Sequence, residues 1–174
     1  RIPDFLFATV ASLLSLYALL PILSRLEEEN QGLAVSFLRR SLVVFFVGMA
    51  AVAGIIFFLV PLLIPFIAPG ITDSAARADL ILLTRMLLLQ PILLGASNIV
   101  AALTQLRHRF FLYAVSPLLY NLGIIVGVIF FYPVWGISGL GWGVLLGALM
   151  HFLVQAIFFV REGTSPQTLP SRHF

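Results

Sequence analysis

The chain has 174 residues, of which 61% are hydrophobic and only 10% are charged. Soluble domains usually carry about a quarter of charged residues, so this composition excludes an ordinary water-soluble domain. All ten basic residues are arginines, and the net charge of +3 comes from short polar segments rather than from a basic patch interleaved with aromatics. Nucleic-acid binding is therefore not expected. The absence of cysteine excludes disulfides, thiolate catalysis and sulfur-ligated metals.

Five apolar stretches are each long enough to cross a bilayer, whose hydrocarbon core of about 30 Å needs about 20 residues of helix. They cover residues 5–23, 42–67, 80–106, 110–131 and 140–160. The first follows Asp4 rather than a basic leader, which favours a membrane helix over a signal peptide. We therefore predict an all-α integral membrane protein, with a helical bundle over residues 1–162 and a flexible polar tail or linker over residues 163–174.

The placement of the arginines predicts an orientation, because cytoplasmic loops hold an excess of basic residues. Seven arginines follow the first, third and fifth stretches: Arg25, Arg39, Arg40, Arg107, Arg109, Arg161 and Arg172. Three belong to the other side: Arg1, Arg77 and Arg85. The larger set is expected in the cytoplasm, which puts residue 1 on the periplasmic side and the tail in the cytoplasm. Since the chain opens at Arg1 without a methionine, we expect an internal piece of a longer protein, with one more crossing before it.

Two polar segments between the apolar stretches have a predicted structure. After a Pro-Gly breaker, Thr72 or Asp73 is a suitable N-cap for a short interfacial helix that begins at Ser74 and leads into the third apolar stretch. The charged residues of that helix are expected to form a stripe facing solvent or lipid headgroups: Arg77, Asp79 and Arg85. The acidic run at residues 25–30, which includes Glu27, is interpreted as a solvated linker.

Among the prolines inside the apolar stretches, Pro91 and Pro117 each follow a polar residue, and each removes a backbone hydrogen bond that lipid cannot replace. Pro91 frees the carbonyl of Leu87, and Pro117 frees that of Tyr113. Asn121 lies one turn beyond Pro117 on the same helix face. Kinked helices with polar neighbours are frequent in alternating-access transporters, but they also occur in static bundles.

Polar side chains at membrane depth are costly and are expected to face partners or a wet cavity. The candidates are Gln90, Asn98, Asn121, His151 and Gln155, together with Arg1 and Asp4 at the outer end of the first stretch. For His151 and the amides, hydrogen bonding between helices is the simpler interpretation. Arg1 and Asp4 are three residues apart on one helix face, and they are the stronger candidates for contact with a substrate.

Glycines recur at a spacing of four in the last two stretches, where small residues let helix backbones approach closely. Gly123 and Gly127 form one such pair, and Gly139, Gly143 and Gly147 form a ridge. This pattern predicts a compact bundle. No phosphate-binding loop, His-Glu-x-x-His motif or carboxylate cluster is present, so we expect no enzyme, no metal site and no cofactor.

Several segments together resemble a known family. Residues 1–6 read Arg-Ile-Pro-Asp-Phe-Leu, residues 68–70 Ala-Pro-Gly, residues 83–85 Leu-Thr-Arg before Pro91, and residues 114–121 Ala-Val-Ser-Pro-Leu-Leu-Tyr-Asn. Gly-Trp-Gly-Val-Leu-Leu-Gly follows at residues 141–147, before His151 and Gln155. In this order and spacing the chain resembles the MurJ (MviN) family of lipid II flippases, of the multidrug/oligosaccharidyl-lipid/polysaccharide transporter superfamily. The resemblance implies helices two to six of about fourteen, part of the N-lobe.

The resemblance also implies a function in the bacterial cytoplasmic membrane, in peptidoglycan and cell-wall biogenesis. Such a protein moves undecaprenyl-pyrophosphate-linked disaccharide-pentapeptide between leaflets by alternating access, and arginines match the pyrophosphate oxygens. Arg1 matches the family's Arg-Ile-Pro-Asn motif and Asp4 stands for its asparagine, so the resemblance implies substrate contact at Arg1 and Asp4, whereas Phe7 and Ala8 stand where the family has a basic pair. The expected partners are membrane lipid, lipid II and the remaining helices of the polypeptide. Alternatives are a flippase for another polyprenyl-linked glycan, a cation-coupled drug exporter, or a non-transporting scaffold.

Overall fold

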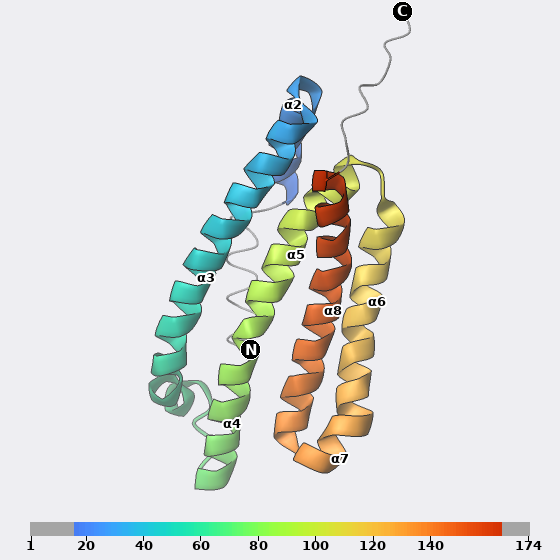
Figure 1. The fold of residues 1–174 in the computed structure, drawn as a ribbon. Coiled ribbons are helices and arrows are strands. Elements are labelled where there is room, and N and C mark those ends of the chain that lie inside the picture. The colour runs from blue at the N-terminus through green and yellow to red at the C-terminus, as the bar shows by residue number, and fades with distance from the viewer. Residues whose placement is uncertain (1–15, 165–174) are drawn as a thin grey trace, which may run out of the picture.

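The computed structural model describes residues 16–164, and every regular element in that range is helical. The elements are α2 (Leu16–Glu29), α3 (Gln31–Ile67), α4 (Ser74–Leu87), α5 (Leu89–Leu106), α6 (Phe110–Val126), the π-helix η1 (Gly127–Phe131), α7 (Tyr132–Trp135) and α8 (Ile137–Thr164). The long helices lie side by side, with α8 between α5 and α6 (Figure 1). The prediction of an all-α fold is confirmed.

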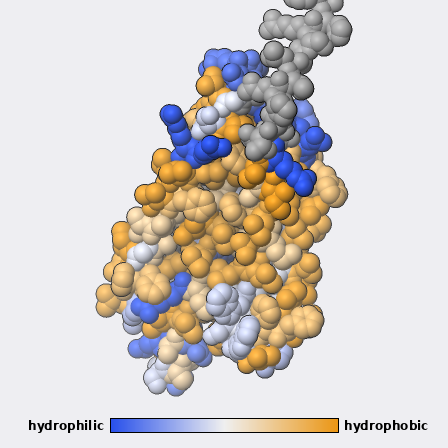
Figure 2. All heavy atoms as spheres, viewed as in Figure 1, coloured by the Kyte–Doolittle hydropathy of each residue, from blue (hydrophilic) through white to orange (hydrophobic). Residues whose placement is uncertain are grey.

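Within residues 16–164, four helical stretches are long and apolar enough to cross a membrane: Gly32–Ile67, Ser74–Leu106, Phe110–Trp135 and Ile137–Arg161. Their outward faces carry large hydrophobic side chains, such as Phe58, Phe66 and Phe111, which are 75%, 84% and 79% exposed. On the visible face, hydrophilic residues gather toward the two ends and a mostly hydrophobic surface separates them (Figure 2). An exterior of this kind fits lipid rather than water as the solvent. The chain therefore belongs to a multi-pass membrane protein.

The first predicted stretch, residues 5–23, lies mostly outside the described residues, and its end forms the start of α2. Helix α3 begins at Gln31, well before the predicted residue 42. The side chain of Asn30 accepts the backbone N–H of Gly32 at 2.7 Å and so caps the helix. The extra turns are amphipathic, because Ala34 and Leu38 are buried while Arg39 and Arg40 are exposed. Hydropathy alone misses such turns because they extend beyond the apolar segment.

Helix α4 begins where the sequence predicts a cap. The carboxylate of Asp73 accepts the backbone N–H of Ala76 at 2.8 Å. As expected, this helix leads into the third span: α4 is separated from α5 by Leu88 alone, and the two helices form one candidate membrane span, Ser74–Leu106. The N–H of Leu88 bonds to the carbonyl of Arg85, which interrupts the α-helical pattern three residues before Pro91.

The hairpin between α6 and α8 ends in a tight turn. The helix continues past the predicted end at residue 131 through η1 and α7 to Trp135. Gly136 then adopts a φ of 57°, and its N–H bonds to the carbonyl of Tyr132 at 2.8 Å. Glycine suits this left-handed conformation because it has no Cβ.

Glycines bring the backbones of this hairpin into contact. Gly123 faces Gly147, and a Cβ added at Gly127 would lie 2.5 Å from the Cα of Gly143. The predicted close approach of these helices is thus present, at the interface with the most extensive contacts in the described bundle. No side chain fits between the two backbones unless they separate.

We expect Gly127→Ala to destabilise the folded protein by about 1–3 kcal/mol, because the added methyl group forces the two backbones apart. Gly54→Ala is the matched control, since nothing lies within 4 Å of a Cβ added at Gly54 in α3. Thermal unfolding in detergent measures both variants. Equal melting temperatures for the two would contradict the close contact.

Candidate functional site

The two residues that the sequence favours for substrate contact, Arg1 and Asp4, lie outside the described residues, as do Phe7 and Ala8. The described part of the chain does place the intramembrane polar residues. Their hydrogen bonds show which helices are joined to one another, and their exposure shows which helix faces lie on the outside of the described bundle.

A chain of hydrogen bonds crosses the interior between α5, α8 and α6. The hydroxyl of Thr104 donates to Oε1 of Gln155 at 2.8 Å, and Nε2 of Gln155 donates to the hydroxyl of Ser116 at 2.8 Å. Ser116 in turn donates to the carbonyl of Leu112 at 2.8 Å. All three polar side chains are fully buried. Gln155 therefore joins three helices in a place where its amide has no access to water.

His151 makes a second contact between α8 and α5. Its Nδ1 lies 2.7 Å from the hydroxyl of Ser97, which is fully buried, and the same hydroxyl lies 3.3 Å from the His151 carbonyl. The tautomer of the ring decides which partner donates in the shorter bond. A third contact joins α5 and α6, where Nε2 of Gln90 donates to the hydroxyl of Tyr120 at 2.9 Å.

These three contacts agree with the interpretation of His151, Gln155 and Gln90 as groups that hold helices together. Sequence reasoning missed their partners Ser97 and Thr104, because a small hydroxyl residue carries little signal in an apolar stretch. Among residues 16–164, no group of three or more His, Cys, Asp or Glu side chains is placed to hold a metal ion. The hydrogen bonds of His151, Gln155 and Gln90 therefore hold neighbouring helices together.

The other polar candidates lie elsewhere. Pro91 is buried and Asn98 is half-buried, whereas Pro117 and Asn121 are exposed on the outer face of α6. The expectation that intramembrane polar groups face the interior is therefore not met for Asn121 within the described bundle. The outer face of α6 therefore exposes Pro117 and the amide of Asn121 on the surface of the described bundle.

Arg85 has a specific partner in α3. Its Nε donates to the backbone carbonyl of Phe57 at 3.0 Å, and its guanidinium carbon lies 4.4 Å from the centre of the Phe57 ring. Pro61, four residues after Phe57, has no N–H with which to bond that carbonyl. Arg85 thus supplies the donor that the proline removes. The expected stripe facing solvent or headgroups is wrong for Arg85, because the side chain is only partly exposed and turned toward α3.

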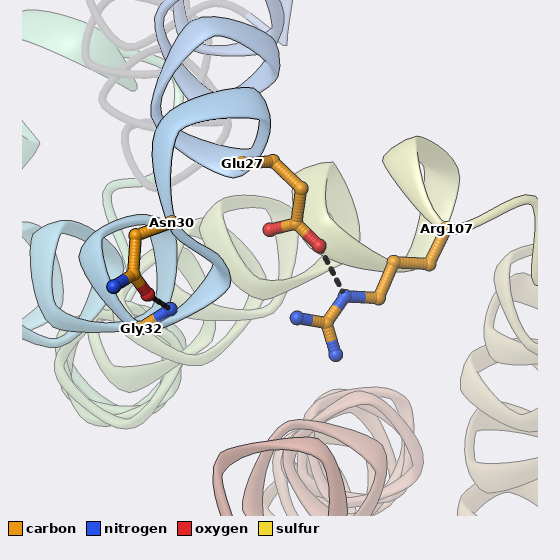
Figure 3. A network of polar contacts seen from close by, with 4 residues as sticks. All are labelled: Glu27, Asn30, Gly32 and Arg107. Atoms are coloured by element: carbon orange, nitrogen blue, oxygen red, sulfur yellow. Dashed lines mark hydrogen bonds and ion pairs between the residues drawn. The ribbon is translucent and has the colours of Figure 1, made fainter. Parts of the chain in front are cut away.

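An ion pair joins α2 to the end of α5. Nε of Arg107 lies 3.0 Å from Oε1 of Glu27, and both side chains are mostly buried, at 15% and 17% exposure (Figure 3). The second oxygen, Oε2 of Glu27, is buried without a hydrogen-bond partner among the described residues. The interpretation of this segment as a solvated linker is therefore wrong for Glu27, since the run is the last turn of α2 and packs against α5.

Comparison with known protein families gives one result. The family model described as lipid II flippase MurJ matches residues 1–174. No curated protein matches the sequence. The family match spans the whole chain, and it agrees with the multi-pass helical bundle.

We expect Thr104→Val and Gln155→Leu to be energetically coupled by about 0.6–1.7 kcal/mol, the range measured for hydrogen bonds between membrane helices. A double-mutant cycle on unfolding in detergent measures this coupling. Thr104→Val paired with Asn121→Leu is the control, since Asn121 is exposed and should show no coupling to Thr104. Absence of coupling between Thr104 and Gln155 would contradict the buried network.

We expect Arg85→Gln to destabilise the protein by about 1.5–3 kcal/mol, because a charge-assisted hydrogen bond to the Phe57 carbonyl is lost. In a Pro61→Ala background the loss should be smaller, since the restored N–H bonds to that carbonyl instead. Arg77→Gln is the control, because Arg77 bonds to the carbonyl of Ile71 and is unaffected by residue 61. If Arg85→Gln lowers the free energy of unfolding equally with Pro61 and with Ala at position 61, Arg85 does not replace the N–H that Pro61 lacks.

Proposed function

Because the chain belongs to the lipid II flippase MurJ family, we propose that it forms part of the N-lobe of a transporter for undecaprenyl-pyrophosphate-linked peptidoglycan precursor. In this proposal the precursor moves from the cytoplasmic to the periplasmic leaflet by alternating access. The observation that carries the proposal is the family match over all 174 residues of a chain with four candidate membrane spans. The family consists of transporters, and catalysis plays no part in the proposal.

The internal contacts support alternating access in a specific way. Rocking of two lobes requires that each lobe move as one body. Helices α6 and α8 are joined by backbone contact at Gly123 and Gly147, and the buried hydrogen bonds of Gln155 join α8 to α5 and α6. Interfaces of this kind resist sliding, because any shift leaves buried polar groups unpaired. We infer that these three helices travel together during transport.

The proposed substrate contacts are Arg1 and Asp4. A pyrophosphate cannot cross hydrocarbon without compensation of its charge, and the forked guanidinium of arginine matches phosphate oxygens. Arg1 takes the phosphate in this proposal, and it also offsets the charge of Asp4, three residues later in the sequence. Pro91 and Pro117, with the amides Asn98 and Asn121, shape helices next to this path.

The distribution of arginines supports an orientation. The loop between α5 and α6 and the ends of α2 and α8 lie at one end of the bundle, and the loop between α3 and α4 lies at the other (Figure 1). The first end carries six of the arginines within the described range: Arg25, Arg39, Arg40, Arg107, Arg109 and Arg161. We propose that this end faces the cytoplasm, as the excess of basic residues indicates.

One sequence feature favours a second candidate. Phe7 and Ala8 replace a basic pair of the family, which reduces the positive charge available to a pyrophosphate. A flippase for another polyprenyl-linked glycan, a cation-coupled exporter and a non-transporting scaffold are the alternatives that this replacement favours. Arginines elsewhere in the intact protein would favour pyrophosphate transport, and a membrane-embedded acidic site would favour ion-coupled export.

The test is rescue of lipid II translocation in bacteria depleted of their own flippase. We expect the intact protein that contains this chain to restore translocation, and Arg1→Ala to reduce it about tenfold or more, because a charge-assisted contact is lost. Arg39→Ala is the control, since Arg39 is an exposed residue of α3 that is not among the proposed substrate contacts. Failure to rescue despite normal membrane insertion would refute the proposed cargo. Unchanged transport by Arg1→Ala would remove Arg1 from the site.

A further inference from the structure

A small cavity lies between the start of α6 and the end of α8. It has a volume of about 350 Å³ and is lined by Arg109, Phe111, Leu112, Phe158 and Arg161. Two of these residues are cations and three are apolar. Leu112 is the one lining residue that also belongs to the network around Gln155, through its backbone carbonyl, and the proposed transport function does not use the cavity.

The backbone before α6 fixes the position of Arg109. The N–H of Arg109 bonds to the carbonyl of Thr104 at 2.9 Å, and the N–H of His108 bonds to that of Gln105 at 3.0 Å. These two bonds form the Schellman motif that ends α5, with His108 at a φ of 56°. Arg109 is the N-cap of α6, and no side chain caps that helix end. Arg109 is thus held at the mouth of the cavity by a defined turn rather than by a loose loop.

The cavity lies at the depth where lipid headgroups meet acyl chains. Phe110 begins one candidate membrane span, and Arg161 ends another. Arg109 and Arg161 are exposed residues at this boundary, while Phe158 is 9% exposed and forms part of the inner wall. Phe111 is 79% exposed and continues the apolar wall outward along α6. Cationic and apolar surfaces therefore meet in one hollow, at the edge of the hydrocarbon.

We propose that this cavity binds an anionic phospholipid, with its phosphodiester between Arg109 and Arg161 and an acyl chain along Phe111 and Phe158. Basic pockets between membrane helices are known to accept anionic lipid headgroups. The planar guanidinium offers paired donors to phosphate oxygens. A free phosphate would leave the three apolar side chains without a partner, whereas a phospholipid satisfies both kinds of surface. The bound lipid joins the start of α6 to the end of α8.

Native mass spectrometry of the purified full-length protein tests this proposal, with phosphatidylglycerol and phosphatidylcholine of identical acyl chains as the two probes. We expect a preference for phosphatidylglycerol, which the double variant Arg109→Gln/Arg161→Gln lowers by about fivefold or more, since each arginine near an anionic lipid contributes about that factor. The matched control is Arg39→Gln/Arg40→Gln, which removes the same charge from α3 outside the cavity. The control should change the preference less than twofold.

Three outcomes would overturn the proposal. The first is that the unsubstituted protein shows no preference for phosphatidylglycerol over phosphatidylcholine. The second is that the control variant loses this preference as much as the cavity variant does. The third is that glycerol 3-phosphate, at the same concentration as the lipid, displaces it. The last outcome would identify a site for free phosphate esters. Loss of fold in the cavity variant is detected separately, because the melting temperature should remain unchanged. Phe158→Ala gives a second reading, since it should weaken binding of both lipids without removing charge.

Discussion

The structure depends on one constraint: within hydrocarbon, every backbone and side-chain polar group must find its partner inside the protein. Proline makes this constraint visible, because each one leaves a carbonyl without its helical donor. At Phe57 the missing donor is supplied by the guanidinium of Arg85, which also packs on the Phe57 ring. An arginine at membrane depth is costly by itself. The hydrogen bond between Arg85 and the Phe57 carbonyl reduces the free-energy cost of burying both groups in the membrane.

The same constraint explains why the interior is tied together so closely. Lipid gives helices no hydrophobic reason to associate, so close packing and hydrogen bonds must hold them. The glycines of α6, η1 and α8 provide the packing, and Gln155 provides the hydrogen bonds to α5 and α6. The result is a unit of three helices with few internal degrees of freedom. Such a unit is what a rocking transporter requires of each half.

The sequence predicts those parts of the fold that depend on local pattern. Hydropathy and length identify the membrane helices, the spacing of glycines identifies the tight hairpin, and Asp73 is recognisable as an N-cap. Pairings between distant segments are different. Arg85 with Phe57, Arg107 with Glu27 and Ser97 with His151 join residues that are 28, 80 and 54 positions apart. No local pattern contains these partners, so the sequence alone predicts solvent or headgroup contact for both Arg85 and Glu27. The substrate contacts predicted at Arg1 and Asp4 remain predictions, because they lie outside the described residues.

The most direct test of the membrane-spanning arrangement uses the fact that the chain has no cysteine of its own. Glu29 and Gly70 are exposed at the two ends of α3. Glu29→Cys and Gly70→Cys, each introduced singly into a cysteine-free form of the intact protein, can be labelled with a membrane-impermeant maleimide on spheroplasts before and after lysis. The account predicts labelling at residue 70 without lysis and at residue 29 only after lysis. Labelling of both residues from the same side would contradict it.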